Sequence, residues 1–197
     1  MIAKIKGIIQ ESINIRAQLL DNEDFIGEIV QLVQELVLVF DRKQKVLFCG
    51  NGGSAADAQH LATELSGRFY LDRAPLFAEA LGTNPAFTTA VGNDYDFSTI
   101  FSRAVRAKGQ PGDALVALST SGNSPNVLKA LKTARELGMI TVGLTGQSGG
   151  QMVDWCDYLI KIPSNDTPRI QEGHILVGHI ICQLIEEILF EEENKCH

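Results

Sequence analysis

A short apolar run, a loop of small polar residues and a helical segment follow one another twice in this sequence, and this plan limits the fold more than any other feature. The first copy comprises residues 45–50, the loop 51–53 and a helix that Ser54 can cap; the second comprises 113–119, the loop 120–123 and a helix opened by Ser124 and Pro125. Further apolar runs are 139–144, 158–162 and, more weakly, 76–81. Continuous apolar strands that alternate with helices indicate a parallel sheet covered on both faces. We therefore predict a doubly wound α/β fold with a parallel five-stranded sheet.

Long helices are expected on either side of this core. Apolar residues recur at three- and four-residue intervals in 2–20 and 24–42, which predicts two N-terminal helices. The last helix should begin with Thr167 as N-cap and Pro168 at its first position, and run through Phe190. The first helix is thinly apolar and the last is apolar on more than one face, so both are expected to pack on neighbouring subunits. We expect a single domain over 1–197, with 1–44 used in oligomerisation and 45–190 forming the α/β core.

Composition narrows the classes of function. The chain has 197 residues, of which 45% are hydrophobic, and can bury one good core. A net charge of −7 without a basic stripe argues against a nucleic-acid partner. Charged residues interrupt the apolar stretches before the roughly 18 residues that a membrane span requires. With no signal-peptide pattern and no C-x-x-C spacing, we expect a cytoplasmic protein with reduced thiols at Cys49, Cys156, Cys182 and Cys196.

A hydroxyl-rich loop follows the second of the two strands. Residues 119–124, Ser-Thr-Ser-Gly-Asn-Ser, place four hydroxyl groups and a glycine at the start of a predicted helix. Free backbone N–H groups and the helix dipole favour an anion at such a position. Serine and asparagine also cap helices and form turns, and this structural role competes with phosphate binding. Because four hydroxyls exceed what capping needs, we favour a phosphate site made by Ser119, Thr120, Ser121 and Ser124.

The glycines after the first strand allow a second interpretation. Residues 50–55 match the relaxed dinucleotide fingerprint G-x-G-x-x-A and follow a predicted strand. A dinucleotide-binding unit also needs an acidic residue at the end of the next strand, whereas the next candidate strand here ends in Leu81-Gly82. A nicotinamide-dependent dehydrogenase is therefore the weaker alternative. The glycines can instead let a sugar approach the backbone closely.

Two pairs of side chains that can bind metals or transfer protons lie at helical spacing. His60 and Glu64 are one turn apart and project together from their helix. Gln171 and His179 share a stripe of the last helix, whereas His174 lies about 140° from His179 and is assigned to structure. Four nitrogen and oxygen donors on two helices could close a tetrahedral zinc site, although glutamine is an uncommon ligand. The histidines could equally act as acid or base without a metal.

Five segments of the chain resemble the phosphoheptose isomerases, a branch of the sugar isomerase (SIS) domain family. They are 49–68 (CGNGGSAADAQHLATELSGR), 90–103 (AVGNDYDFSTIFSR), 119–131 (STSGNSPNVLKAL), 144–150 (LTGQSGG) and 167–186 (TPRIQEGHILVGHIICQLIE). The hydroxyl-rich loop alone identifies the wider family. The His60/Glu64 and Gln171/His179 pairs point to this branch. The resemblance implies a flavodoxin-like SIS fold with extra N-terminal helices.

The resemblance also implies an activity and a site. It implies an aldose–ketose isomerase that converts D-sedoheptulose 7-phosphate to D-glycero-D-manno-heptose 7-phosphate, the first step toward the heptose of bacterial surface polysaccharides. It implies a homotetramer with active sites shared between subunits, and one zinc ion per subunit on His60, Glu64, Gln171 and His179. Substrate contacts are implied for Asn51, Gly52, Gly53, Ser54, Glu64, Asn93, Asp94, Ser119, Thr120, Ser121, Ser124 and Gln171.

An enediol mechanism needs one group that takes a proton from C1 and another that serves the carbonyl oxygens. We assign Glu64 as the base and His179 as the acid; the reverse assignment stays open, as does whether zinc is catalytic or structural. The alternative function is a non-catalytic SIS protein that binds a sugar phosphate or a protein partner. Related proteins of that kind lack the C-terminal histidine, so His179 favours the enzyme. Which nucleotide-heptose pathway the product feeds stays open.

Overall fold

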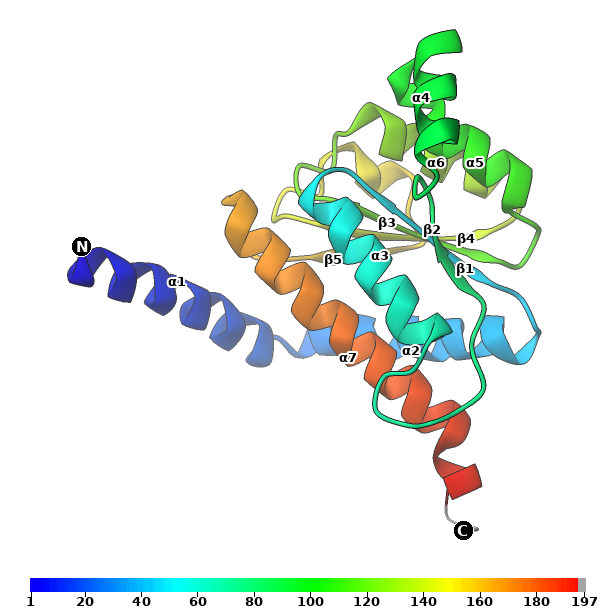
Figure 1. The fold of residues 1–197 in the computed structure, drawn as a ribbon. Helices are drawn as coiled ribbons and strands as arrows, with labels where there is room; N and C mark the ends of the chain where they lie inside the picture. The colour runs from blue at the N-terminus through cyan, green and yellow to red at the C-terminus, as the bar shows by residue number, and fades with distance from the viewer. Residues whose placement is uncertain (195–197) are drawn as a thin grey trace.

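Five parallel strands form the centre of the molecule in the order β2-β1-β3-β4-β5 (Figure 1). They are β1 (Val46–Gly50), β2 (Ala78–Ala80), β3 (Ala114–Ser119), β4 (Ile140–Thr145) and β5 (Tyr158–Lys161). All neighbouring pairs run parallel, which confirms the predicted doubly wound sheet. The order is the one found in flavodoxin-like sheets and differs from the 3-2-1 start of dinucleotide-binding folds.

The computed structural model describes residues 1–194, with side-chain packing as far as residue 190, so Cys196 lies outside the described residues. Its α-helices are α1 (Ile2–Leu20), α2 (Glu23–Asp41), α3 (Gly53–Ser66), α4 (Pro85–Asp94), α5 (Ile100–Lys108), α6 (Pro125–Glu136) and α7 (Thr167–Asn194). Short 3₁₀ helices η1 (Phe97–Thr99) and η2 (Gly150–Asp154) lie in the connections. The helices predicted at 2–20 and 24–42 are confirmed to within one residue at each end.

Helices cover both faces of the sheet (Figure 1). Alternate residues of β1 separate two buried clusters: Val46 and Phe48 pack with α2, α3 and α7, whereas Leu47 and Cys49 pack with α5 and α6. Both faces of each central strand are therefore apolar, which explains why the strands are continuous apolar runs in the sequence.

A buried ion pair fixes the amino ends of β1 and β3. The Asp113 carboxylate accepts hydrogen bonds from the backbone N–H of Lys45 (3.0 Å) and of Gln110 (2.8 Å). It also lies 2.6 Å from the ammonium of Lys45. Asp113 has no exposed surface, so it is a buried charge with several partners. This contact lies at the edge of the sheet opposite the loops that follow the strands.

The start of α3 differs from the prediction. Ser54 was expected to cap this helix, but the N-cap is Gly52, with φ +56°, and α3 begins at Gly53. Ser54 lies in the first helical turn and is buried. The loop after β1 turns through a backbone conformation that glycine adopts more readily than other residues, so the helix begins before a serine cap could act.

By length and composition alone, α7 could cross a membrane, which the charged residues along the sequence did not lead us to expect. Half of its apolar window is buried inside the fold, however. It packs against α3, α2 and α1. Its hydrophobic character is thus largely explained by its place as a core helix. Thr167, predicted as N-cap, is the first residue of the helix.

Candidate active site

The carboxyl ends of β1 and β3 meet where the strand order reverses, which is where ligands bind in open α/β sheets. A reciprocal pair of amide hydrogen bonds, both 2.8 Å, joins Asn51 after β1 to Asn126 at the start of α6. The predicted site residue Asn51 thus uses its side chain to align the two loops. The sequence did not identify Asn126, because nothing in its spacing indicates a partner 75 residues away.

The hydroxyl-rich loop from Ser119 to Ser124 is arranged around these carboxyl ends. The hydroxyls of Ser119 and Ser124 lie 3.0 Å apart. Ser124 occupies the N-cap position of α6, yet its side chain makes no capping hydrogen bond. Gly122 has φ +64°, and a Cβ there would collide with the carbonyl of Gly149. The loop therefore packs tightly on the next loop, and the Ser124 hydroxyl is not used for capping.

A polar pocket of about 260 Å³ opens beside this loop. It is lined by Thr120, Ser121, Asn123, Gly146, Ser148, Asn165, Thr167 and Ile170. Ser148, Asn165 and Thr167 were not among the predicted site residues. They follow β4 and β5, and only the parallel arrangement of the strands brings them to the same edge as the Ser119–Ser124 loop.

His60 and Glu64 from α3 and His179 from α7 form one cluster, in which one ligand atom from each residue lies within 4.8 Å of the others. The two Nε2 atoms of His60 and His179 are 2.8 Å apart. Glu64 Oε1 lies 3.1 Å from His60 Nε2. Only one proton fits between the imidazole nitrogens, so at least one nitrogen lone pair points into the cluster. The half-exposed His60 leaves the cluster accessible.

The donor set fits a zinc ion. With Zn–N and Zn–O bonds near 2.0–2.1 Å, the ligand atoms of a tetrahedral site lie about 3.3 Å apart. The separations of His60 Nε2 from His179 Nε2 (2.8 Å) and from Glu64 Oε1 (3.1 Å) are close to that value. Three protein ligands and an open position are typical of catalytic zinc. Cys182 lies one turn beyond His179 on α7. Burial, followed by the charge of Glu64, raises the pKa of Cys182 to about 12. Its Sγ faces the carbonyl of Leu61, 4.0 Å away.

A close approach of α3 and α7 brings the cluster together. Gly178, next to His179, faces the side chain of Leu61, next to His60, and a Cβ at Gly178 would lie 2.5 Å from Leu61. With a larger residue at this point, either the Leu61 side chain or the two helices would have to move. Asp57, one turn before His60, has a buried oxygen, Oδ2, without a hydrogen-bond partner among the described residues. Burial raises the pKa of Asp57, and the nearby His60 opposes the shift.

The other predicted ligand, Gln171, lies elsewhere on α7. Its side chain contacts Gly53 at the start of α3, where a Cβ would collide with it. At 1.5 Å per residue, it is about 12 Å along the helix axis from His179. Gln171 therefore lies beside the glycine loop within one chain. Asn93 and Asp94 are exposed at the end of α4, where the Asn93 amide donates to the Asp94 carboxylate (2.9 Å).

His174 is fully buried. Burial lowers its pKa to about 4, against a smaller opposing effect of the Thr145 backbone. Within residues 1–194, neither ring nitrogen has a partner in hydrogen-bond geometry. The His174 ring is therefore neutral at physiological pH. It packs inside the fold, whereas His60 is accessible to solvent.

A hydroxyl-rich loop follows β3 at the strand-order reversal, and a cluster of two histidines and a glutamate lies between α3 and α7. This combination fits a class of proteins that bind a small anionic ligand and transfer protons. A SIS domain model matches residues 10–146, which ends before α7. Phosphoheptose isomerase of Aneurinibacillus thermoaerophilus is 50% identical over 189 residues, covering 96% of both chains. Phosphoheptose isomerase 2 of Campylobacter jejuni is 48% identical over 98% of this chain and 96% of its own.

Solved structures agree with these relatives. The phosphoheptose isomerase of Neisseria gonorrhoeae superposes with a TM-score of 0.88 at 40% identity, over 94% of this chain and 98% of that one. The one from Francisella tularensis gives 0.90 at 36% identity, with the same coverage. This chain belongs to the SIS domain family and, within it, to the phosphoheptose isomerases. The relatives do not favour the non-catalytic alternative.

Gly178→Ala should lower the free energy of unfolding by about 1–3 kcal/mol, because the added methyl group would overpack against Leu61. Gly7→Ala is the matched control: it lies in α1 with no atom within 4 Å of the added Cβ, and should stabilise by up to about 1 kcal/mol through helix propensity. Urea unfolding of both variants measures the difference. Equal stabilisation of the two would show that α3 and α7 are not closely packed at Gly178.

Proposed function

We propose that this protein interconverts D-sedoheptulose 7-phosphate and D-glycero-D-manno-heptose 7-phosphate through an enediol, in the cytoplasm, as the first step toward surface heptose. The observation that carries the proposal is the cluster of His60, Glu64 and His179. The names of relatives that are 50% and 48% identical over nearly the whole chain support the substrate class.

The reaction moves the carbonyl from C2 to C1. Glu64 takes a proton from C1, and His179 donates a proton to the oxygen on C2, which gives the enediol. His179 then removes the proton from the oxygen on C1 while Glu64 returns one to C2. Each such proton transfer contributes about 10²–10⁴ in rate. The reversed roles of Glu64 and His179 remain the alternative.

Zinc bound by this cluster would supply Lewis-acid stabilisation of the charge that develops on the carbonyl oxygen. His60, Glu64 and His179 of one chain would hold it. Gln171 of the same chain lies beside Gly53, so the proposed fourth ligand, Gln171, would have to come from a neighbouring subunit. A carboxylate has two oxygen atoms, and Oε1 of Glu64 is the one that faces His60. Glu64 can therefore bind through one oxygen and accept a proton on the other. In the same way, His179 would bind zinc through one ring nitrogen and carry the transferred proton on the other.

The 7-phosphate is proposed to bind the loop of Ser119, Thr120, Ser121 and Ser124, at the start of α6. The pocket beside this loop supports the placement. The remaining proposed contacts to the sugar are Asn51, Gly52, Gly53, Ser54, Glu64, Asn93, Asp94 and Gln171.

Glu64→Gln and His179→Gln should each reduce turnover by at least about 100-fold, because each removes a group that transfers a proton. Turnover of sedoheptulose 7-phosphate, with circular dichroism on the same samples, measures this. Since both residues lie in one cluster of one chain, mixing the two inactive variants should not restore activity. Turnover near the wild-type rate in either variant would remove that residue from the mechanism.

The double substitution of Ser121 and Ser124 by Ala should weaken binding of the 7-phosphate by about 2–5 kcal/mol, since hydrogen bonds to charged groups contribute about 1.5–3 kcal/mol each and need not add. Binding of sedoheptulose with and without its phosphate group is compared by calorimetry. A wild-type protein that binds both sugars equally would contradict the phosphate assignment.

We also propose a homotetramer in which residues 1–44 and α7 build the interfaces and residues 45–190 form the catalytic core. α1 extends away from the sheet (Figure 1), and only Ile15 and Leu19 on it are buried. Its exposed apolar residues are Ile2, Ile5, Ile8, Ile9, Ile13 and Leu20. An apolar groove of about 390 Å³ between α1, α2 and α7 adds to this surface. A single chain leaves too much apolar surface in contact with water.

Light scattering across a dilution series should give a mass of about four chains. If Asp94 completes the site of a neighbouring subunit, mixing Glu64→Gln with Asp94→Ala and exchanging subunits should restore about a quarter of the sites, because a site is intact only when each variant supplies its undamaged half. A monomer with full activity would contradict both the tetramer and the shared site.

A further inference from the structure

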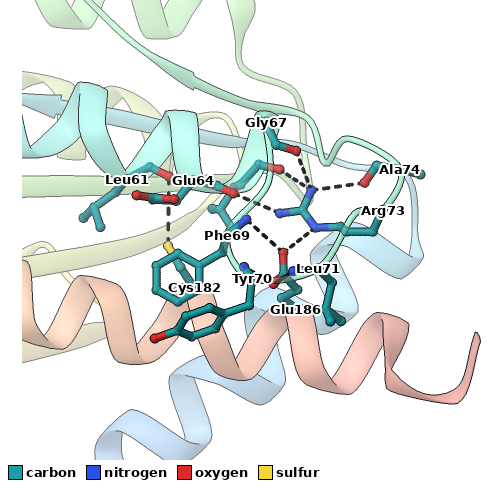
Figure 2. Close-up of polar contacts among 11 residues, drawn as sticks. Leu61, Glu64, Gly67, Phe69, Tyr70, Leu71, Arg73, Ala74, Cys182 and Glu186 are labelled. Atoms are coloured by element: carbon teal, nitrogen blue, oxygen red, sulfur yellow. Dashed lines mark hydrogen bonds and ion pairs between the residues drawn. The ribbon is translucent and has the colours of Figure 1, made fainter. Parts of the chain in front are cut away.

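A buried carboxylate on α7 accepts hydrogen bonds from the backbone of the loop that follows α3 (Figure 2). Glu186 is 1% exposed. Its Oε1 accepts hydrogen bonds from the N–H of Tyr70 (2.6 Å) and of Leu71 (2.8 Å). Its Oε2 accepts from the N–H of Phe69 (3.1 Å) and from Nε of Arg73 (2.8 Å). Both oxygens are thus fully used.

Arg73 extends the network to the end of α3. Its Nη2 donates to the carbonyl of Glu64 (2.9 Å) and its Nη1 to the carbonyl of Leu65 (2.7 Å). Weaker contacts reach the carbonyls of Gly67 (3.3 Å) and Ala74 (3.1 Å). The last carbonyls of a helix have no partner within the helix, so the guanidinium both caps α3 and neutralises the negative end of its dipole.

The same loop places an aromatic ring against the cluster. The Phe69 ring lies 5.7 Å from the His179 ring, centroid to centroid, with a tilt of 46°. Tyr70 packs edge-on against Phe69 at 4.5 Å. Because Glu186 accepts hydrogen bonds from the N–H groups of both residues, it restrains the backbone from which the Phe69 ring reaches the imidazole.

We propose that Arg73 and Glu186 are positioning residues for the His60–Glu64–His179 cluster. One arm runs through Arg73 to the backbone of Glu64, and the other through Phe69 to the ring of His179. Together they fix the two helices that supply the proton-transferring and metal-ligating groups. The inference rests on the proposed function, and it adds a means by which the separation and orientation of these groups are set.

The chemistry of the pair favours positioning over simple stabilisation. Burying an ion pair costs desolvation that packed apolar residues would avoid, so the pair adds little stability compared with apolar packing, although removing one partner is destabilising. Such a pair can instead define one arrangement. Burial alone would raise the pKa of Glu186, but the hydrogen bonds from Leu71, Phe69, Tyr70 and Arg73 outweigh it and hold the pKa below its ordinary value. Stability from this carboxylate is complete above the ordinary glutamate pKa and is lost only as pH falls through the lowered value.

Glu186→Gln and Arg73→Lys test the proposal in the full-length protein. Glutamine keeps the shape but turns an amide group toward a donor. Lysine keeps the charge but replaces the three nitrogens with which Arg73 reaches Glu186 and α3 by a single nitrogen. Asp113→Asn is the matched control, since it also removes a buried carboxylate that accepts two backbone N–H groups and pairs with a cation, and its partners Lys45 and Gln110 lie on neither α3 nor α7. After metal removal, Co²⁺ alone is titrated by its visible absorption, and kcat and KM are measured at saturating metal.

Both test variants should bind Co²⁺ about 10–100-fold more weakly and lose kcat by a similar factor, as is typical when groups that orient metal ligands are removed. KM should stay within about twofold, because the loop proposed to bind the phosphate lies between β3 and α6, where neither substitution is made. Asp113→Asn should lower the urea midpoint yet keep the wild-type Co²⁺ affinity and kcat. Test variants that lose only stability, as the control does, would overturn the proposal.

Phe69→Leu tests one arm alone in case Glu186→Gln does not fold. It should reduce kcat while leaving the urea midpoint close to wild type, and an unchanged kcat would remove this arm.

The proposed function is judged separately on the wild-type protein. If the wild type does not convert sedoheptulose 7-phosphate, that function fails and the positioning role is decided by Co²⁺ affinity. If the wild type binds no Co²⁺, the metal proposal fails and kcat decides.

Discussion

The contact between α3 and α7 is the constraint on which the rest of the site depends. The missing side chain of Gly178 lets Leu61 approach within contact distance, and the residues next to them in the sequence, His179 and His60, therefore meet. The Arg73–Glu186 pair joins the end of α3 to α7 about two turns beyond His179. Neither helix could supply the cluster alone, because α3 carries two of its three groups and α7 the third.

The candidate site divides into two parts with different physical origins. The position of the hydroxyl-rich loop is set by the sheet, because Ser119 is the last residue of β3. The reciprocal amide pair of Asn51 and Asn126 aligns this loop with the loop that follows β1. The acid–base cluster belongs to the helix pair on one face. The proposed anion binding and proton transfer can therefore vary separately on a shared fold, which is how one fold supports many functions.

Much of the fold was predictable, because each central strand is buried on both faces and so appears as an uninterrupted apolar run. The five strands and the two N-terminal helices lie where the sequence placed them. The prediction that Ser54 caps α3 was wrong, because Gly52 adopts a positive φ in the preceding loop and the helix already begins at Gly53. It also gave no sign of Asn126 or of the pocket residues after β4 and β5, since their proximity arises from strand order.

The sequence by itself determined which residues could do chemistry: helical periodicity put His60 and Glu64 on one side of a helix, and the repeat of strand, loop and helix put hydroxyls at a helix start. Only the tertiary structure decided which of them meet. His179 joins His60 and Glu64, whereas Gln171, on the same helix, lies beside Gly53. The physical reason is that periodicity fixes the direction of a side chain within one helix, while the distance between helices depends on packing at single positions such as Gly178.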